Sequence, residues 1–441
     1  MQLDAAQFFA PPANQGPSSS APRVAVVTNS FTPYRIHLHR RIVAEVPEVE
    51  LWSLATHGNA YNRWSRSVVP AMINPLEFGN GEPTVEQTRL RYVGREWHKA
   101  GRIIRWLQDH AVAAVFCQGC GDVGRLRILR WCHRRRIPCF LTGDCNIRSD
   151  HCGGLRRLVK RAVFRQAAAW SYGIMPCGQY GRALFERYGA RSKPILLFPF
   201  VPDVELFENP PADAIDSTRR RFKLDAQRRR LLFSARLMRV KRPDLAIKAF
   251  AAIALGRPEW DLVIAGDGGL RRELEASVPA GLRDRIVWTG FIDDTRQLSG
   301  LYAQCDALLL PSDKEPWGVV VVEAAAAGLA IVTSDVVGAS AELVDCDRNG
   351  AVFPAGDLDA LTQALRHVTD RRHIDGLKSE SRHVLREWLT SADPVMGFRA
   401  ALMTCGVLNE SSNDTWNLPN DTRSTADRDF VYRSAQPTTP G

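Results

Sequence analysis

The 441-residue chain has no uninterrupted apolar run long enough to cross a bilayer. A membrane-spanning helix needs about 18 such residues, and the longest candidate, residues 317–333, is interrupted by Glu323 and Gly328. Residues 1–22 also lack the cationic start and apolar stretch of a signal peptide, and are rich in Pro, Ser, Ala and Gln. We therefore expect a disordered leader and a cytoplasmic protein, with peripheral binding to the inner face of the plasma membrane as a further option.

Cysteine is present without the spacing of a structural framework. Ten cysteines are scattered singly, which is typical of reduced, buried thiols rather than of disulfides. Cys117 and Cys120 form one Cys-x-x-Cys pair, and no second pair follows at the spacing that a zinc site requires. The sequence therefore predicts no metal site.

Glycine is missing where a nicotinamide-binding protein needs it. The segment after the first expected strand, residues 28–31, reads Thr-Asn-Ser-Phe and does not contain the fingerprint Gly-x-Gly-x-x-Gly. This absence argues against a nicotinamide oxidoreductase.

Charge is unevenly distributed along the chain. Residues 23–200 hold about 28 Lys and Arg against about 12 Asp and Glu, whereas the rest of the chain is net acidic within a total of +10. A basic half can meet nucleic acid, anionic lipid or a phosphorylated substrate, and charge alone does not decide between them. No helix-turn-helix, RNP-type strand or zinc-finger spacing supports nucleic acid, so we expect no nucleic-acid partner.

Apolar strands alternate with amphipathic helices in both halves of the chain. This order predicts an α/β fold, in which each half forms a parallel sheet with helices on both faces. The proline-interrupted segment at about 199–216 is the expected hinge. The predicted organisation is a leader at 1–22, a first Rossmann-like domain at 23–205, a second at 206–385, a helix at 386–405 that crosses back to the first domain, and a polar tail at 406–441. Two such domains would face a central cleft at the carboxyl ends of their strands, where these folds bind ligands.

The segment 311–323 carries two carboxylates around a predicted helix start. Glu315 lies in a loop after an apolar strand, and Glu323 follows four valines that favour a strand by propensity. Four alanines and Gly328 come next, which only a helix fits. Helix amides at Trp317, Gly318 and Val319 would carry partial positive charge suited to a phosphate or a sugar hydroxyl. The alternative is that the two residues bind no ligand, so that Glu315 is an ordinary charged loop residue and Glu323 a solvated residue of the helix.

Four further short elements accompany this pair of carboxylates. In chain order the five are Phe233-Ser234-Ala235-Arg236-Leu237 with Lys241, Ala265-Gly266-Asp267-Gly268, Gly290-Phe291-Ile292, Glu315 and Glu323 with seven residues between them, and Arg348-Asn349-Gly350 followed by Phe353-Pro354-Ala355-Gly356-Asp357. Together they resemble the signatures of the retaining glycosyltransferases of family four, the glycosyl transferases group 1, which have the GT-B fold of two Rossmann-like domains. The resemblance extends over residues 23–403 and is strongest over 231–357.

The resemblance implies roles for individual residues. Arg236 and Lys241 would hold the donor diphosphate, and a guanidinium fork and an ammonium suit that task chemically. Glu315 would contact hydroxyls of the transferred sugar and Glu323 the ribose. Asp293 or Asp294 would reach the nucleotide base, although capping of the helix at 295 is an equally good interpretation.

One candidate lies in the first domain. Asp144 follows the expected strand at 138–142, and in relatives a polar residue near this place meets the donor sugar. The alternative is that Asp144 caps a turn. By the resemblance, Asp144 and Glu315 are the catalytic candidates.

The sequence also departs from the family pattern. Ala235 stands where the family usually has Gly, which could narrow the approach of a phosphate, and Val322 replaces a frequent Asn. Residues 29–35 replace a Gly-Gly loop with Asn-Ser-Phe-Thr-Pro-Tyr-Arg, a form that resembles a branch associated with bacterial surface polysaccharides.

The activity that the resemblance implies is transfer of a sugar from a UDP- or GDP-linked donor to a hydroxyl of a glycan or lipid-linked acceptor. The configuration would be retained, and no metal or other cofactor would be required. Other GT-B enzymes, such as sugar-phosphate synthases, stay open. A basic nucleic-acid- or lipid-binding protein without transferase activity is the alternative from another class.

Residues 155–165 form a predicted amphipathic helix whose cations suit a lipid surface. Its apolar positions would form one stripe, and Arg156, Arg157, Lys160 and Arg161 lie around it. One interpretation is an outer helix whose stripe lies in the core. The other is attachment to an anionic membrane, where each base contributes about 1 kcal/mol.

Overall fold

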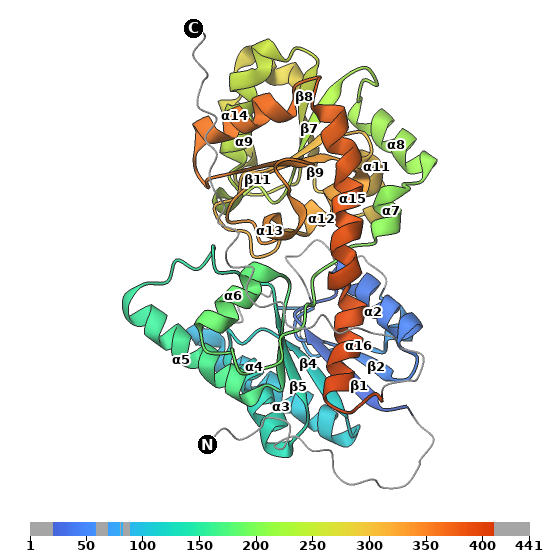
Figure 1. Cartoon of the computed structure of the whole chain (residues 1–441), viewed down its shortest axis with the longest axis vertical. Helices are drawn as coiled ribbons and strands as arrows, with labels where there is room; N and C mark the ends of the chain where they lie inside the picture. Colours follow the sequence, from blue (N-terminus) through green and yellow to red (C-terminus); the bar gives the residue numbers. More distant parts are fainter. Residues whose placement is uncertain (1–20, 59–68, 80, 83–88, 410–441) are drawn as a thin grey trace. The chain divides into compact units, whose positions relative to one another are not determined.

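The computed structural model describes residues 21–58, 69–79, 81–82 and 89–409. Most of the predicted leader and of the polar tail, residues 1–20 and 410–441, lies outside the described residues. Two six-stranded sheets follow one another along the chain, in the orders β3-β2-β1-β4-β5-β6 and β12-β11-β10-β7-β8-β9 (Figure 1). Their strand pairs are parallel. The predicted α/β architecture with two doubly wound sheets is confirmed.

The first sheet is covered by helices on both faces. One face packs against α3, α4 and α5 through a core that includes Val27, Leu129 and Leu141, and the other packs against α2 and α16. The strands are β1 (Arg23–Thr28), β2 (Glu50–Ala55), β3 (Pro75–Glu77), β4 (Ala114–Gln118), β5 (Cys139–Gly143) and β6 (Gly173–Pro176). The helices are α2 (Pro33–Glu45), α3 (Val93–Asp109), α4 (Val123–Arg135), α5 (Gly154–Trp170) and α6 (Gln179–Arg187), with 3-10 turns at Ala71–Ile73 and Leu90–Tyr92.

The second sheet repeats this arrangement with a core on each face. Its strands are β7 (Arg229–Ser234), β8 (Trp260–Ala265), β9 (Ile286–Gly290), β10 (Ala307–Leu310), β11 (Ala330–Ser334) and β12 (Gly350–Phe353). Its helices are α7 (Val204–Glu208), α8 (Ala212–Phe222), α9 (Pro243–Ile253), α10 (Arg271–Ser277), α11 (Thr295–Tyr302), α12 (Val319–Ala327), α13 (Ser340–Leu343), α14 (Leu358–Val368) and α15 (Ile374–Ala392). Short 3-10 turns lie at Arg239–Lys241, Ala254–Gly256 and Ala280–Arg285.

The last two helices lie end to end and belong to different sheets (Figure 1). Helix α15 packs against α12 and β11 of the second sheet, whereas α16 (Pro394–Thr404) packs against α2 of the first. Asp393 starts α16 by accepting from the amides of Val395 and Met396, with Pro394 at the first helical position. Phe398 then stacks on Phe116 of β4, with ring centroids 4.4 Å apart. The chain therefore contributes its final helix to the core of the first sheet.

The four valines at 319–322 form the start of helix α12. Val321 and Val322 are fully buried, as are the alanines at 324–326. Gly328 ends the helix in the left-handed conformation, with φ of 73°. The prediction of a helix against strand propensity is therefore confirmed, and the packing of its buried residues outweighs the β preference of valine.

The strand order of the second sheet places a ligand-binding position between β7 and β10. The chain leaves these adjacent strands toward opposite edges of the sheet, since β8 and β9 follow β7 while β11 and β12 follow β10. At such a switch point the loops beyond the carboxyl ends of the strands diverge and leave room for a ligand. The loops that carry the two strongest sequence elements are those that follow β7 and β10.

Candidate functional site

An ion pair joins the two loops at this switch point. Lys241 Nζ, from the loop after β7, donates to Glu315 Oε2 in the loop after β10. Both side chains are 13% exposed, so the pair is partly shielded from water and yet accessible to a ligand. The residue predicted to bind the diphosphate, Lys241, is therefore in direct contact with the residue predicted to bind the sugar, Glu315.

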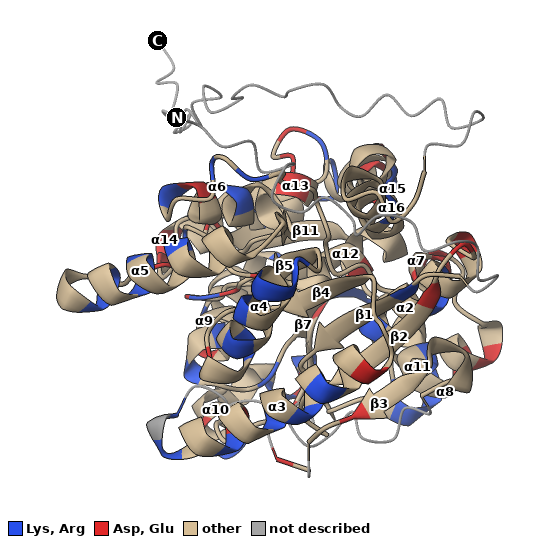
Figure 2. Cartoon of the chain, turned by 90° about the horizontal axis from the view of Figure 1, so that it is seen from below, with Lys and Arg blue, Asp and Glu red and all other residues tan. Residues whose placement is uncertain are grey.

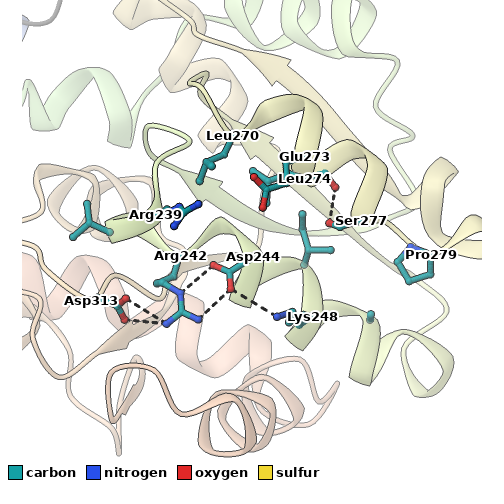
Figure 3. Close-up of a pocket in the computed structure, with 13 residues that line it drawn as sticks. Arg239, Arg242, Asp244, Lys248, Leu270, Glu273, Leu274, Ser277, Pro279 and Asp313 are labelled. Carbon is teal, nitrogen blue, oxygen red and sulfur yellow. Dashed lines mark hydrogen bonds and ion pairs between the residues drawn. The ribbon is translucent and has the colours of Figure 1, made fainter.

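A second ion pair, between Arg242 and Asp313, also joins these two loops. Arg242 lies 3.2 Å and 3.3 Å from the two carboxylate oxygens of Asp313, and the Asp313 amide donates to the Val240 carbonyl at 2.9 Å. Arg242 also binds Asp244 at the start of α9. Figure 3 shows these contacts beside a cavity of about 720 Å³ whose lining includes neither Lys241 nor Glu315. These contacts hold Lys241 and Glu315 in register.

Two glycines of the segment 265–268 allow its backbone to approach the backbone of the loop after β7 closely. A Cβ atom at Gly266 would come 2.0 Å from the Ala235 carbonyl oxygen, and one at Gly268 would come 2.3 Å from that of Leu237. The backbones are also joined by hydrogen bonds from Ala235 and Leu237. Ala235 has no left-handed φ, so alanine replaces the family's usual glycine there without backbone strain.

Glu323 is the single charged residue of helix α12 and lies in an apolar environment. Tyr302, fully buried on α11, donates its hydroxyl to Glu323 Oε2 at 2.7 Å. Burial of the carboxyl group raises the pKa of Glu323 to about 7, although the Tyr302 hydrogen bond acts in the opposite direction. A carboxylate kept in such a place at an energetic cost is typical of functional sites.

The residues between the two carboxylates serve the fold as well as the site. The Trp317 indole is 3% exposed and donates to the Phe200 carbonyl at 2.9 Å. Gly318 precedes α12 with φ of 96°, and the helix begins at Val319. Trp317 therefore has its side chain in the core, so that only its backbone can meet a ligand.

Three further candidates lie at the ends of β7 and β9. Arg236 is exposed just beyond β7, two residues after the strand ends, and Asp293 is exposed after β9. Asp294 accepts from the Arg296 amide and is the N-cap of α11. Capping is therefore the observed task of Asp294, and contact with a base stays a prediction for Asp293.

The first sheet reaches this site through the loop after β5. Asp144 is partly exposed in that loop. Asn146, two residues further on, is 4% exposed and donates from Nδ2 to the Glu315 carbonyl at 2.8 Å. The sequence reasoning missed Asn146, since no motif identifies it.

A polar network occupies the switch point of the first sheet, between β1 and β4. Arg125 is 2% exposed and contacts Asp122, the Gln118 carbonyl, Thr56 and Asn29. Sequence analysis did not find this network because its members come from three separate segments, around residues 29, 56 and 118–125. Its hydrogen bonds fix the loops beyond the carboxyl ends of β1, β2 and β4 relative to one another.

Within the described residues, one group of side chains has the composition of a metal site. Ligand atoms of His57, Glu82 and Glu96 lie within 4.8 Å of one another. Lys99 Nζ lies among them, 2.5 Å from Glu82 Oε1 and 3.2 Å from Glu96. This group is therefore an ion-pair cluster with its own cation. The ten cysteines are all free thiols, and burial raises the pKa of Cys117 to about 12.

Helix α5 carries an exposed apolar stripe. Leu155, Leu158 and Val159 expose 75%, 62% and 57% of their surfaces. The interpretation that this stripe lies in the core is therefore wrong for its first two turns. Lys160 instead forms an ion pair with Asp150 at 2.6 Å, so this cation is engaged by the protein itself.

No helix in the described part of the chain combines the length and apolarity of a membrane span.

Two parallel six-stranded sheets, each covered by helices, are typical of the GT-B class of fold. Residues 214–387 match the family model described as glycosyl transferases group 1. The match covers less than half of the chain, and it confirms the resemblance of this part to the glycosyl transferases group 1. The predicted GT-B fold is confirmed as well.

Individual relatives are similar over part of their length. The chain is 37% identical to an uncharacterized glycosyltransferase of Methanocaldococcus jannaschii over 31% of this chain and 35% of that protein. It is 29% identical to the lipopolysaccharide core biosynthesis mannosyltransferase LpsB of Rhizobium meliloti, over 38% and 49% respectively. The chain thus spans less than half the length of these curated relatives.

A solved structure resembles the whole fold. Anabaena HepE in complex with UDP and glucose has a TM-score of 0.65 and 16% identity, covering 88% of this chain and 100% of that chain. At 16% sequence identity, this similarity shows a shared fold alone.

Proposed function

We propose that the chain transfers a sugar from a nucleoside-diphosphate sugar to a hydroxyl of a glycan or lipid-linked acceptor, with retention of configuration. The observation that carries this proposal is the Lys241–Glu315 pair at the switch point of the second sheet. A cation for the diphosphate and a carboxylate for the sugar must be neighbours, because the two groups are joined by one bond in the donor.

The nucleotide would bind to the second sheet. Arg236 and Lys241 neutralise the diphosphate, so no divalent cation is required in this proposal. Glu323 accepts hydrogen bonds from the ribose hydroxyls, and Asp293 contacts the base. The amides at the start of α12, from Trp317 to Val319, add positive potential near the phosphates.

The sugar would lie between the two sheets. Glu315 accepts from its hydroxyls on one side, and Asp144 contacts it from the loop after β5. The leaving diphosphate accepts the proton of the incoming hydroxyl with its own oxygen, on the face that it leaves, so retention needs no carboxylate nucleophile. The similarity to the Rhizobium lipopolysaccharide mannosyltransferase supports a role in cell-surface polysaccharide or glycolipid synthesis.

A thermal-shift panel of UDP, GDP and their sugars tests the donor proposal. At 100 times its dissociation constant, the correct nucleotide should stabilise the protein by about 2.7 kcal/mol. Lys241→Ala should weaken that binding by about 1.5–3 kcal/mol, the range for hydrogen bonds to charged groups. EDTA should leave the binding unchanged.

The matched control is Lys248→Ala, since Lys248 is 62% exposed on α9 of the same domain and is absent from the proposed contacts. Stabilisation by no member of the panel would overturn the donor proposal. Equal affinity in wild type and Lys241→Ala would remove Lys241 from it.

We also propose that α5 and its neighbours lie against an anionic membrane and present the enzyme to a lipid-linked acceptor. Arg156, Arg157 and Arg161 are exposed beside the apolar stripe of α5. A hollow of about 730 Å³ between α3, α4 and α5 continues this surface with three tryptophans and three arginines, Trp97, Trp131, Trp170, Arg127, Arg130 and Arg134. Figure 2 shows Lys and Arg in several turns of these helices. Tryptophan, exposed aliphatic groups and arginine together suit the headgroup region.

Changing Arg156, Arg157 and Arg161 together to Gln should reduce sedimentation with anionic vesicles by about 100-fold in partition, at about 1 kcal/mol for each base. Lys160 is left intact because of its ion pair with Asp150. The matched control changes three exposed arginines of the second sheet's domain to Gln, namely Arg220, Arg272 and Arg283. Equal sedimentation of the two triple variants, or of wild type on neutral and anionic vesicles, would contradict the proposal.

A further inference from the structure

Asn146 connects the first sheet to the loop that carries Glu315. It lies in the loop after β5 and is 4% exposed. Its Nδ2 donates to three backbone carbonyl oxygens, those of Glu315 at 2.8 Å, Pro316 at 3.1 Å and Val336 at 3.1 Å. One side chain from the first sheet therefore holds two loops of the second.

The hydrogen bonds determine the orientation of this amide. Asn146 Oδ1 accepts from the Ser149 amide at 2.8 Å, and a flipped side chain would place Oδ1 against three carbonyl oxygens. Ser149 Oγ adds a bond to the Val336 carbonyl at 3.3 Å. The position therefore requires a donor, which an aspartate at neutral pH cannot supply.

The three acceptors belong to a closely packed pair of loops. The Gly338 amide donates to the Glu315 carbonyl at 3.1 Å, and the Ala339 amide donates to the Trp317 carbonyl at 2.8 Å. A Cβ atom at Gly338 would come 2.1 Å from the Pro316 carbonyl oxygen. Asn146 bonds to both loops of this pair, and one of its bonds is to the backbone of Glu315 itself.

A separate contact keeps the two sheets together without Asn146. Glu342, on α13, accepts from the Gln179 amide at the start of α6 at 2.5 Å and from the Trp388 indole at 3.2 Å. A Cβ atom at Gly178 would come 2.7 Å from Glu342 Oε1. Because this contact is independent, a change at Asn146 should leave the assembly of the sheets intact.

We propose that Asn146 is a positioning residue that holds Glu315 in its sugar-binding place only while the loop after β5 is seated on the second sheet. Placement of Glu315 is thereby coupled to the approach of the first sheet, which carries the acceptor side. The inference rests on the proposed function, because it acts through the role of Glu315 in transfer. The hydrogen bonds of the Asn146 side chain go to backbone groups, so its proposed effect on the sugar is exerted through Glu315.

Kinetics with the full chain test this coupling. Asn146→Ala should lower kcat by about tenfold, as expected for one buried hydrogen-bonding group, and Asn146→Asp by more, because its carboxylate would face three carbonyl oxygens. The dissociation constant of the nucleoside diphosphate should stay within about twofold, because Asn146 bonds to the loops at 315–316 and 336 and not to the residues proposed to hold the diphosphate. The matched control is Asn209→Ala, whose amide bonds to Glu205 in its own helix.

Hydrogen exchange supplies a readout that does not depend on activity. Asn146→Ala should accelerate exchange of the Gly338 and Ala339 amides by at least about fivefold while the amide of Gln179 stays protected. Unchanged exchange there, unchanged kcat, or a nucleotide affinity that falls in parallel with kcat would each overturn the proposal. The two proposals can fail separately. If exchange accelerates as expected but the wild type transfers sugar from no donor, the loop contact is supported and the proposed transferase function is contradicted.

Discussion

Replacing Glu315 with glutamine should slow sugar transfer by about 100-fold, the effect of removing one preorganised charged contact from an active site. Affinity for the nucleoside diphosphate should stay unchanged or increase. In the free protein Glu315 pairs with Lys241, and a neutral glutamine would free the Lys241 ammonium for the phosphates. The measurement is kcat for transfer beside calorimetric binding of the nucleotide alone.

A carboxylate elsewhere in the same domain provides the control. Glu273 is exposed on α10 and lines the cavity behind the loop rather than the site, so Glu273→Gln should change transfer by less than about twofold, as surface substitutions usually do. A Glu315→Gln variant that loses nucleotide affinity by the same factor as turnover would place Glu315 on the nucleotide instead of the sugar.

Replacing Glu323 with glutamine should have the opposite signature, with a more stable free protein and weaker nucleotide binding. Burial raises the folded-state pKa of Glu323 to about 7. A raised pKa means that the contribution of this group to stability is complete below its unfolded-state pKa, near 4.5, and is lost as pH rises through about 7. Glutamine stays neutral and can still accept from Tyr302.

Urea unfolding at pH 5 and pH 8 measures this contribution. Between these two values the wild type should lose about 2 kcal/mol more stability than Glu323→Gln, a figure below the full linkage value because the residue is only partly buried. Nucleotide binding at pH 8 should weaken by about 1.5–3 kcal/mol in the variant, the range for hydrogen bonds to a charged group. Identical pH dependence in the two proteins would mean that the ionised carboxylate is not destabilised by its surroundings.

The positions of the elements around the candidate site follow from local sequence. Strands Trp260–Ala265 and Ala307–Leu310 can be predicted from the sequence alone, because a short apolar run that ends at glycine or proline has few alternatives. Helix α12 was also predictable, since Gly328 supplies the left-handed terminator that a strand does not need. The order of these elements specifies which strands carry Lys241 and Glu315.

Other elements gave weaker local signals. Strand β2 and helix α3 are examples. Helix α3 begins after Tyr92 without a capping side chain and contains Gly94 and Gly101, so its start signal is weak. Its amphipathic stripe gains stability by packing on α4, which is a long-range contact.

By itself the sequence determined two α/β halves, the resemblance of residues 214–387 to glycosyl transferases group 1, and the choice of Glu315 and Glu323 as candidates, because each of these depends on residue type and on local spacing. The tertiary structure alone decided that Asn146 reaches Glu315 across 169 positions of sequence, and that burial shifts the pKa of Glu323. It also decided that the apolar stripe of α5 faces outward. These features depend on which surfaces other elements cover, and burial of that kind has no local signature in the chain.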